Sequence, residues 1–375
     1  VRDHGRGLSF RLAGVSAAAH ALCRALGISL PIIQAPMAGV QGSALAIAVS
    51  GAGALGSLPC AMLGPAAIAS ELQAIRGATR QPYNVNFFCH APPEADDARQ
   101  ARWREALRPY YAEFGLDPDH ATPTPPRLPF DAETLDAIAP FAPPVVSFHF
   151  GLPAPPLLQR VKAWGATVLA SATTLEEALW LERHGADVII AQGLEAGGHR
   201  GMFLEGDITT QLGTFALVRG IVRAVRTPVI AAGGIADRAG IGAALALGAA
   251  GVQLGTVYLL CPESTTSAVH RAALQSPAAR HTALTNVFTG RPARAIVNRV
   301  MRERGPMSTL APAFPLAIGA IAPLRAAAEA RGSGDFSPLW AGQDTSGCRA
   351  VAAAELTREL GADWDATGAK TTRNA

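Results

Sequence analysis

At residues 186–201 the chain reads ADVIIAQGLEAGGHRG, and this stretch decides the expected fold. Its first half is an apolar, β-branched run, which is typical of a strand buried on both faces of a parallel sheet. Its second half is a loop with four glycines, His199 and Arg200. The active sites of α/β barrels lie in loops that follow the C-terminal ends of such strands. We therefore expect a functional loop here, in which Glu195 and Arg200 form a structural ion pair.

Further apolar strand candidates occur along the chain, with helical segments between them. In chain order the full set is Pro31–Met37, Gly53–Leu58, Tyr83–Phe88, Val145–Phe150, Thr167–Ala172, Val188–Gln192, Pro228–Ala232 and Gly251–Thr256. The alternation predicts an α/β fold, and this strand number favours a (β/α)8 TIM barrel over an open doubly wound sheet. The stretch Gly51-x-Gly53-x-x-Gly56 has a dinucleotide-binding form, but it does not lie between a strand and a helix. We interpret it as a helix-to-strand turn.

Three parts are expected along the chain. Residues 28–263 form the barrel, and the segment 91–144 within it is longer than one crossover helix needs, which indicates an insertion. From 264 to 331 helical patches and prolines replace the strand pattern. This change predicts a mostly helical lobe, appended after the eighth strand and placed over the barrel mouth. Residues 332–365 are expected to return to the barrel, with 336–343 as a loop at the site.

Composition excludes several classes of protein. Hydrophobic residues make up 49% of the 375 residues and charged residues 16%, so there is ample material for a core. The net charge of +3 is small and spread out, which speaks against a nucleic-acid partner. No apolar run reaches the roughly 20 residues of a membrane span. The five cysteines are odd in number and widely spaced, which favours a reducing, cytoplasmic compartment and no structural metal.

The ends of the seventh and eighth strands have the composition of a phosphate site. In many barrels a phosphate binds between these two loops, held by backbone N–H groups and the N-terminus of a short helix. Gly233 and Gly234 supply one half, and the residues Gln253, Leu254, Gly255 and Thr256 supply the other. The alternative interpretation is that these glycines only form tight turns.

The remaining strand ends carry groups suited to a flavin ring, which needs amide partners for its polar edge. Asn86 and Gln192 are amides at strand ends, and Met37 offers a backbone N–H. His199 is the candidate that faces the reacting atoms, because its charge changes near neutral pH. His149 is a second candidate at a strand end. The alternatives are a solvated loop histidine, a buried core histidine and an asparagine that stabilises a turn.

Several motifs together resemble the nitronate monooxygenase family, formerly called 2-nitropropane dioxygenase, and its class I members in particular. They are Gln34-Ala35-Pro36-Met37-Ala38-Gly39, Asn84-Val85-Asn86-Phe87-Phe88-Cys89-His90, Ser147-Phe148-His149-Phe150-Gly151, Gln192-Gly193-x-Glu195-Ala196-Gly197-Gly198-His199-Arg200-Gly201, Ala231-Ala232-Gly233-Gly234-Ile235, Gln253-Leu254-Gly255-Thr256 and the stretch Asp335 to Gln343. They run from about Pro31 to Gln343, nearly the whole chain. The Glu-Ala-Gly-Gly-His motif alone is shared with flavin enoyl reductases and NADH:quinone reductases.

The resemblance implies a barrel that binds FMN non-covalently and without metal. By motif match, the FMN contacts are Met37, Asn86, Gln192, Gly197, Gly234, Gln253, Leu254, Gly255 and Thr256. The match makes His199 the catalytic histidine and His149 a second, substrate-binding one. Some members line the pocket with tyrosines and a lysine, but residues 264–331 contain neither. The resemblance therefore leaves the substrate side of the pocket unassigned.

The reaction that the resemblance implies is the oxidative denitrification of an alkyl nitronate, such as propionate 3-nitronate. Oxygen is the co-substrate, and the products are a carbonyl compound and nitrite. One alternative is an NAD(P)H-dependent flavin reductase of quinones or enoyl thioesters, and another is a barrel that binds FMN without catalysis. The partners expected are thus small molecules, and a homodimer is an option that the sequence leaves open.

Overall fold

The barrel consists of eight parallel strands. The computed structural model describes residues 17–94, 96–119 and 127–364. The barrel strands are β1 (Ile32–Gln34), β2 (Gly56–Pro59), β3 (Tyr83–Phe88), β4 (Val145–His149), β5 (Thr167–Ala172), β6 (Val188–Gln192), β8 (Val229–Ala232) and β9 (Gly251–Leu254). Their order is β1-β9-β8-β6-β5-β4-β3-β2, and a parallel bridge from Ile33 to Leu55 joins the two ends. The predicted (β/α)8 barrel is confirmed.

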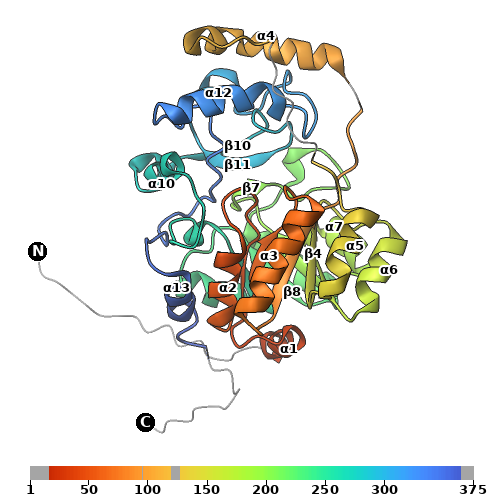
Figure 1. Ribbon diagram of the computed structural model, residues 1–375. Helices are drawn as coiled ribbons and strands as arrows, with labels where there is room; N and C mark the ends of the chain where they lie inside the picture. Colours follow the sequence, from red (N-terminus) through yellow and green to blue (C-terminus); the bar gives the residue numbers. More distant parts are fainter. Residues whose placement is uncertain (1–16, 95, 120–126, 365–375) are drawn as a thin grey trace, which may run out of the picture.

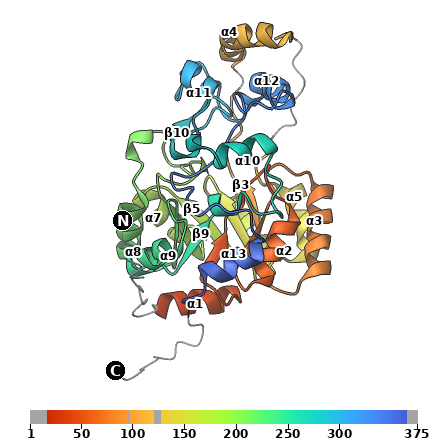
Figure 2. The same ribbon diagram turned by 90° about the vertical axis from the view of Figure 1, so that its left-hand side faces the viewer.

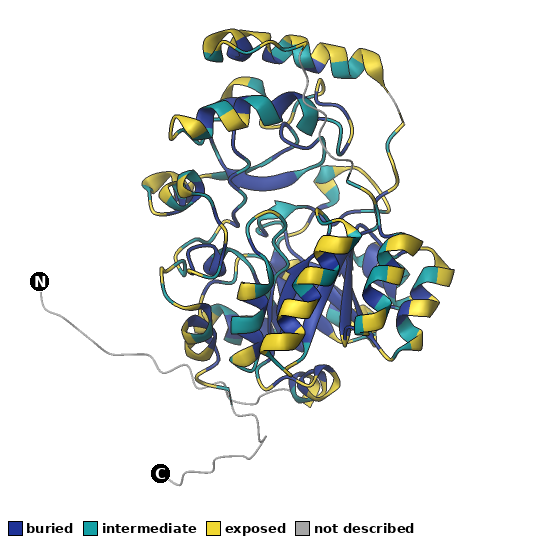
Figure 3. Ribbon diagram, in the orientation of Figure 1, coloured by how far each residue is buried: buried dark blue, intermediate teal, exposed yellow. Residues whose placement is uncertain are grey.

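Helices cover the outside of the barrel (Figure 1). They are α1 (Ala17–Leu26), α2 (Ser43–Gly51), α3 (Pro65–Ala78), α5 (Ala132–Ile138), α6 (Pro155–Ala163), α7 (Leu175–Arg183), α8 (Thr214–Ala224), α9 (Arg238–Ala246) and α13 (Ala353–Leu360), with short 3-10 turns at Ala139–Phe141, Ile208–Thr210 and Thr256–Tyr258. Side chains cap several helix starts: Asp237 Oδ1, for example, accepts a hydrogen bond from Gly240 N at 2.8 Å. Figure 3 shows the barrel strands buried and the outward helix faces exposed.

Several strand boundaries differ from the sequence prediction: β1, for example, covers Ile32–Gln34 rather than Pro31–Met37. The second strand begins at Gly56 rather than Gly53, because Gly53 (φ +91°) belongs to the turn that follows α2. A Cβ on Gly56 would lie 2.1 Å from the carbonyl oxygen of Ala46, so only glycine lets α2 pack this close to β2. The interpretation of this stretch as a helix-to-strand turn is confirmed. The eighth strand ends at Leu254, since Thr256 already starts a 3-10 turn.

The lobe above the barrel contains a small antiparallel sheet as well as helices (Figure 2). Its helices are α10 (Ala268–Leu274), α11 (Arg299–Arg304) and α12 (Ile318–Ala330), with a 3-10 turn at Pro277–Arg280, and its strands are β10 (Thr282–Thr285), β11 (Ala293–Ile296) and β7 (Gly198–His199), in the order β10-β11-β7. The sequence predicts no clear strand between 264 and 331, and this is wrong for β10 and β11. Because β7 lies in the loop after β6, the lobe sheet is continuous with the barrel's functional loop.

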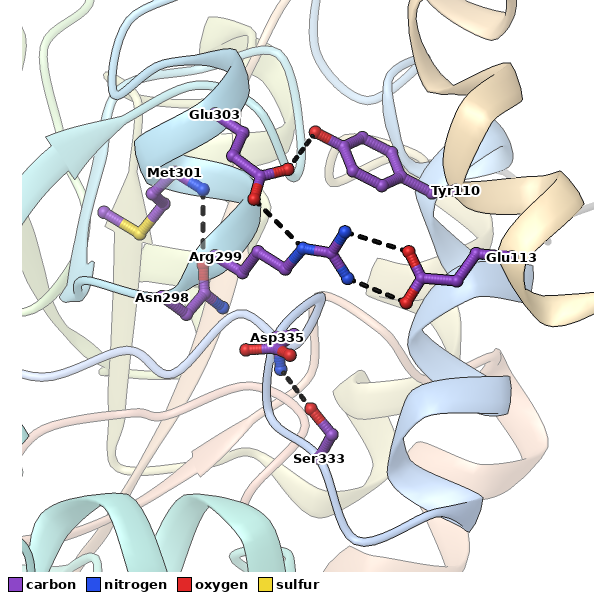
Figure 4. A network of polar contacts seen from close by, with 8 residues as sticks. All are labelled: Tyr110, Glu113, Asn298, Arg299, Met301, Glu303, Ser333 and Asp335. Carbon is purple, nitrogen blue, oxygen red and sulfur yellow. Dashed lines mark hydrogen bonds and ion pairs between the residues drawn. The ribbon is translucent and has the colours of Figure 1, made fainter.

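The insertion between β3 and β4 supplies one more helix to the lobe. This helix, α4 (Asp97–Phe114), lies along α12 at the end of the lobe away from the barrel (Figure 1). Figure 4 shows the polar contacts between α4 and α11: Arg299 donates to both carboxylate oxygens of Glu113 at 2.9 Å, and Tyr110 Oη donates to Glu303 at 2.7 Å. Residues 95 and 120–126 of the insertion lie outside the described residues.

The division of the chain into a barrel (28–263), a lobe (264–331) and a returning segment (332–365, of which residue 365 lies outside the described residues) stays a prediction. Over residues 17–94, 96–119 and 127–364, no helix combines the length and the apolar character that crossing a membrane requires.

Candidate active site

A cavity of about 350 Å³ lies at the C-terminal ends of the barrel strands, beneath the lobe. The structure brings the sequence-predicted site residues together there: Met37, Asn86, His149, Gln192, Gly197, His199, Gly234, Gln253, Gly255 and Thr256 all line it. Leu254 is the exception, because its side chain is 1% exposed and packs in the barrel core. The roles assigned to these residues remain predictions.

His199 lies in β7, the strand that joins the barrel loop to the lobe. Its imidazole is surrounded by the rings of Phe88, Phe150, Phe314 and Trp340, with ring centroids 5.4 to 6.2 Å away. Nε2 of His199 lies 2.9 Å from the hydroxyl oxygen of Thr289. Burial, and then the positive charge of Arg127, lowers the pKa of His199 well below its usual value. The imidazole is therefore uncharged at neutral pH in this cavity.

The backbone of His199 is held by two side chains from the barrel strands. Gln192 Nε2 donates to the carbonyl oxygen of His199 at 2.9 Å, and Gln192 Oε1 accepts from Gly201 N at 2.7 Å. His149 Nε2 lies 3.2 Å from the same carbonyl oxygen. The side-chain amide of Gln192 thus fixes the loop through Oε1 and one N–H of Nε2. The second N–H of Nε2 remains for a ligand.

The expected ion pair between Glu195 and Arg200 does not form, because the loop directs each side chain to a different element. Arg200 is fully buried and donates to the carbonyl oxygens of Gln192 and Gly193 at 2.6 and 2.7 Å. The carboxylate of Glu195 accepts hydrogen bonds from the backbone N and the hydroxyl of Thr214, at the start of α8. Both side chains therefore fix the shape of the loop without pairing.

The ends of β8 and β9 form a cradle of hydrogen-bond donors. The N–H groups of Gly234, Gly255 and Thr256 have no backbone acceptor within the part of the chain that the structure describes. Gly234 has φ +67°, a conformation that favours glycine. Thr256 Oγ1 accepts from Gly342 N at 2.9 Å, which leaves the hydroxyl hydrogen free to donate. These donors fit the phosphate of a flavin nucleotide.

One buried acceptor in the same cavity also lacks a partner. Oε1 of Gln253 makes no hydrogen bond among the described residues, and Gln253 lines the cavity next to the cradle. An unpaired buried acceptor costs free energy, so a ligand with a donor at this point is favoured. Asn86 is held in place by donation from Nδ2 to the hydroxyl of Ser147 at 2.9 Å. Both amides suit the polar edge of a flavin ring.

Sequence reasoning missed several residues around His199. Thr289, Arg291 and Phe314 come from lobe loops, and Arg127 comes from the insertion. The guanidinium of Arg291 lies 3.9 Å from the ring centroid of Phe150 and donates to the carbonyl oxygen of Met202. Such loop residues follow no periodic pattern, so the sequence contains no local signal for them. Trp340 lies in the stretch 336–343 that we expected to return to the site.

The geometry contains no arrangement for metal chemistry in the part of the chain that is described. No three histidine, cysteine, aspartate or glutamate side chains in those residues are grouped so that they can bind a metal ion.

Comparisons with known proteins show the family of the chain. The nitronate monooxygenase family model matches residues 19–363. A nitronate monooxygenase of Pseudomonas aeruginosa is 46% identical over 347 residues, which cover 90% of this chain and 97% of that protein. One from Paraburkholderia phytofirmans is 43% identical, covering 91% and 93%.

Among solved structures, a nitroalkane oxidase from Streptomyces ansochromogenes is similar with a TM-score of 0.84 and 38% identity, covering 92% of this chain and 97% of that chain. FabK from Thermotoga maritima is similar with a TM-score of 0.68 and 26% identity, covering 92% and 95%. A cavity of about 350 Å³ at the strand ends of a (β/α)8 barrel, with a histidine enclosed by aromatic rings, thus coincides with matches over nearly the whole chain. The chain belongs to the nitronate monooxygenase family, and it is a flavin-dependent oxidoreductase.

Proposed function

We propose that this chain uses FMN to convert alkyl nitronates of the propionate 3-nitronate type, with oxygen, into a carbonyl compound and nitrite. Its family supports flavin-dependent nitronate oxidation. One observation carries the assignment of an anionic substrate: Arg127 lines the cavity, and the charges of Arg127 and Arg291 are among those that lower the pKa of His199. Opposite charges attract more strongly in a desolvated cavity than in water, so this region favours an anion.

The residues that would hold FMN form two groups, one for its phosphate and one for its ring. Gly234, Gly255 and Thr256 would bind the phosphate, and the amides of Asn86 and Gln253 would bind the ring. When bound, FMN supplies the redox chemistry, since it takes electrons from the nitronate and passes them to oxygen. The aromatic rings around His199 exclude water from the side of the cavity where this exchange takes place.

His199 acts on the nitronate itself. A nitronate is already an anion, so its oxidation needs no strong base. Burial disfavours the imidazolium form of His199, and a bound anion opposes that effect by Coulomb attraction. His199 therefore stabilises the nitronate by a hydrogen bond or an ion pair. In its neutral form it accepts the proton of a parent nitroalkane.

A flavin titration tests this function. The protein is reconstituted with FMN, and propionate 3-nitronate is added without oxygen. The proposal expects an immediate change in the flavin absorption spectrum, and catalytic oxygen uptake with nitrite release once air is admitted. Rapid bleaching by NADH, with no response to nitronate, would instead identify an NAD(P)H-dependent flavin reductase. Binding of FMN with neither response would identify a non-enzymatic barrel.

We also propose a cytoplasmic location. All five cysteines have free thiols. Burial is the main cause that raises the pKa of the Cys23 thiol to about 11 and that of Cys348 to about 12. Buried thiols without disulfide partners are typical of proteins in reducing compartments.

A further inference from the structure

Arg127 is a cation on the cavity wall, and its guanidinium has no hydrogen-bond or ion-pair partner among the described residues. The residue lines the cavity. Its backbone is fixed near the end of β3, because His90 Nε2 donates to the carbonyl oxygen of Arg127 at 3.0 Å and Phe130 N donates to that of Phe88 at 2.8 Å. The position of Arg127 is therefore set by the barrel.

No acidic side chain among the described residues forms an ion pair with Arg127. Glu329 and Asp344 also line the cavity, but neither is paired with Arg127, and the carboxylate of Glu329 already accepts from Arg325 Nε at 2.8 Å and from the hydroxyl of Ser337 at 2.7 Å. Burial, and then the charge of Arg325, lowers the pKa of Arg127 to about 10, so the group stays cationic at neutral pH. This wall thus carries an excess positive charge with unused donors, which an anion would satisfy.

The anion in question is not the FMN phosphate. The phosphate cradle lies at the ends of β8 and β9, whereas Arg127 is anchored at β3. In the closed order β1-β9-β8-β6-β5-β4-β3-β2, β3 and β8 lie on opposite sides of the barrel. The charge of Arg127 does act on His199, so Arg127 faces the side of the cavity where the substrate reacts. The anion that fits here is a second charged group of the substrate.

We propose that Arg127 is a specificity-determining residue that binds the carboxylate of a carboxylated nitronate. This inference rests on the proposed function and names the residue that recognises the carboxylate end of its substrate. A guanidinium offers two parallel N–H donors, which match the geometry of a carboxylate. With His199 at the nitronate end and Arg127 at the carboxylate end, the enzyme distinguishes a dianionic nitronate from a simple alkyl nitronate of the same length.

Two substrates with the same skeleton test this directly. Propionate 3-nitronate and propyl-1-nitronate differ only in the terminal group, a carboxylate in the first and a methyl in the second. The wild type is expected to have the higher kcat/KM for propionate 3-nitronate. In Arg127→Met, kcat/KM for propionate 3-nitronate should fall by roughly 10- to 100-fold, the range of a lost charge-assisted hydrogen bond, with a change of about threefold or less for propyl-1-nitronate. Arg127→Lys should recover part of the loss, and the exposed Arg223→Met on α8 should change neither value.

A non-reacting mimic gives a second readout. Succinate has the length and the two charges of propionate 3-nitronate, but it cannot be oxidised here. It should inhibit the wild type competitively, more strongly than butyrate does, and Arg127→Met should abolish that difference. Flavin content is measured for each variant to separate binding of substrate from folding.

The outcomes are distinct. Equal wild-type kcat/KM values for the two nitronates would overturn the inference even if no Arg127 variant folds. An equal loss on both substrates in Arg127→Met would also overturn it, since Arg127 would then serve the nitronate end or the fold. If the wild type oxidises neither nitronate, the proposed function itself fails.

Discussion

Nε2 of His149 lies 3.2 Å from the backbone carbonyl oxygen of His199. A carbonyl oxygen only accepts hydrogen bonds, so Nε2 of His149 carries a proton. Burial is the main cause that lowers the pKa of His149 to about 3, so the ring is neutral at pH 7 and Nδ1 carries no proton. The sequence led us to expect a substrate-binding role for His149. By this contact the residue also positions the loop that presents the His199 imidazole.

The buried histidines predict how stability depends on pH. Burial lowers the pKa of His149 to about 3 and that of His270 to about 4, and it also lowers the pKa of His90 and His199. The unfolded chain, with histidine pKa values near 6.5, binds more protons below that pH, so stability is full above about pH 6.5 and falls as the pH decreases toward 4. Each such histidine contributes up to about 1.4 kcal/mol per pH unit in that range.

Melting temperatures at pH 7.5 and pH 5.0, at constant FMN, check this expectation. The wild type should melt at a clearly lower temperature at pH 5.0. His149→Gln should show a smaller difference between the two pH values, because one titrating group has been removed. A melting temperature that does not change over this range would contradict the buried neutral state of these histidines.

Replacement of His199 by asparagine tests its place in the chemistry. Asparagine keeps a polar side chain next to Thr289 but cannot take up a proton or a charge. We expect His199→Asn to bind FMN normally and to lose roughly 10²-fold or more in kcat for nitrite release, which is the usual contribution of a proton-transferring group. His184→Asn is the matched control, because His184 lies on the outside of the barrel, stacked on Trp180. Near wild-type turnover by His199→Asn would show that the assigned role is wrong.

The part of the site that the sequence predicts is the part built on strand ends. Asn86, Gln192 and Gln253 lie in the C-terminal halves of β3, β6 and β9, and parallel strands of a barrel bring their C-terminal ends to one face. Chain order and periodicity therefore suffice to place them together. Leu254 shows the limit of this reasoning, because its neighbours face the cavity while its own side chain alternates into the core.

The lobe could not be predicted in the same way. β10 is four residues long, and its Thr-Ala-Leu-Thr sequence lacks the apolar run that marks a buried strand. Contacts such as that of Thr289 with His199 join residues far apart in the chain, and they depend on how the lobe packs on the barrel. The same holds for Arg127, whose segment gives no signal that it returns to the end of β3.

Gly193 tests how closely the functional loop must pack. A Cβ at this position would lie 1.9 Å from Thr214 Oγ1 and 2.4 Å from the Cα of Thr214, so Gly193→Ala must push the loop away from α8. We expect a loss of about 1–3 kcal/mol in the free energy of unfolding, the usual cost of overpacking, and a reduced FMN content. Gly220→Ala is the matched control, since Gly220 lies in α8 with open space at its Cβ position. It should stabilise the protein by up to about 1 kcal/mol. Denaturant unfolding measures both changes. Equal free energies of unfolding for the two variants would disprove the packing argument.

Two kinds of contact attach α4 to the lobe, namely an apolar cluster and an ion pair. Trp103 is 1% exposed and packs in a cluster with Leu107, Val287 and Phe288. The ion pair between Arg299 and Glu113 has two partly exposed side chains, at 30% and 45%. Exposed ion pairs contribute little to stability because water and salt screen them, whereas burial of an indole removes a large apolar area from water. We infer that the cluster around Trp103 holds α4 in place.

Two variants separate these contributions. Trp103→Ala should cost about 3–5 kcal/mol, as large-to-small changes of buried aromatic residues do, and it should expose α4 to limited proteolysis. Arg299→Met should leave α4 protected, because methionine can pack against the rings of Tyr110 and Phe336, over which the guanidinium of Arg299 now lies at 5.3 and 5.9 Å from the ring centroids. Added salt should change the proteolysis of the wild type little for the same reason. If Arg299→Met or salt released α4 as readily as Trp103→Ala, the ion pair and not the apolar cluster would be what holds it.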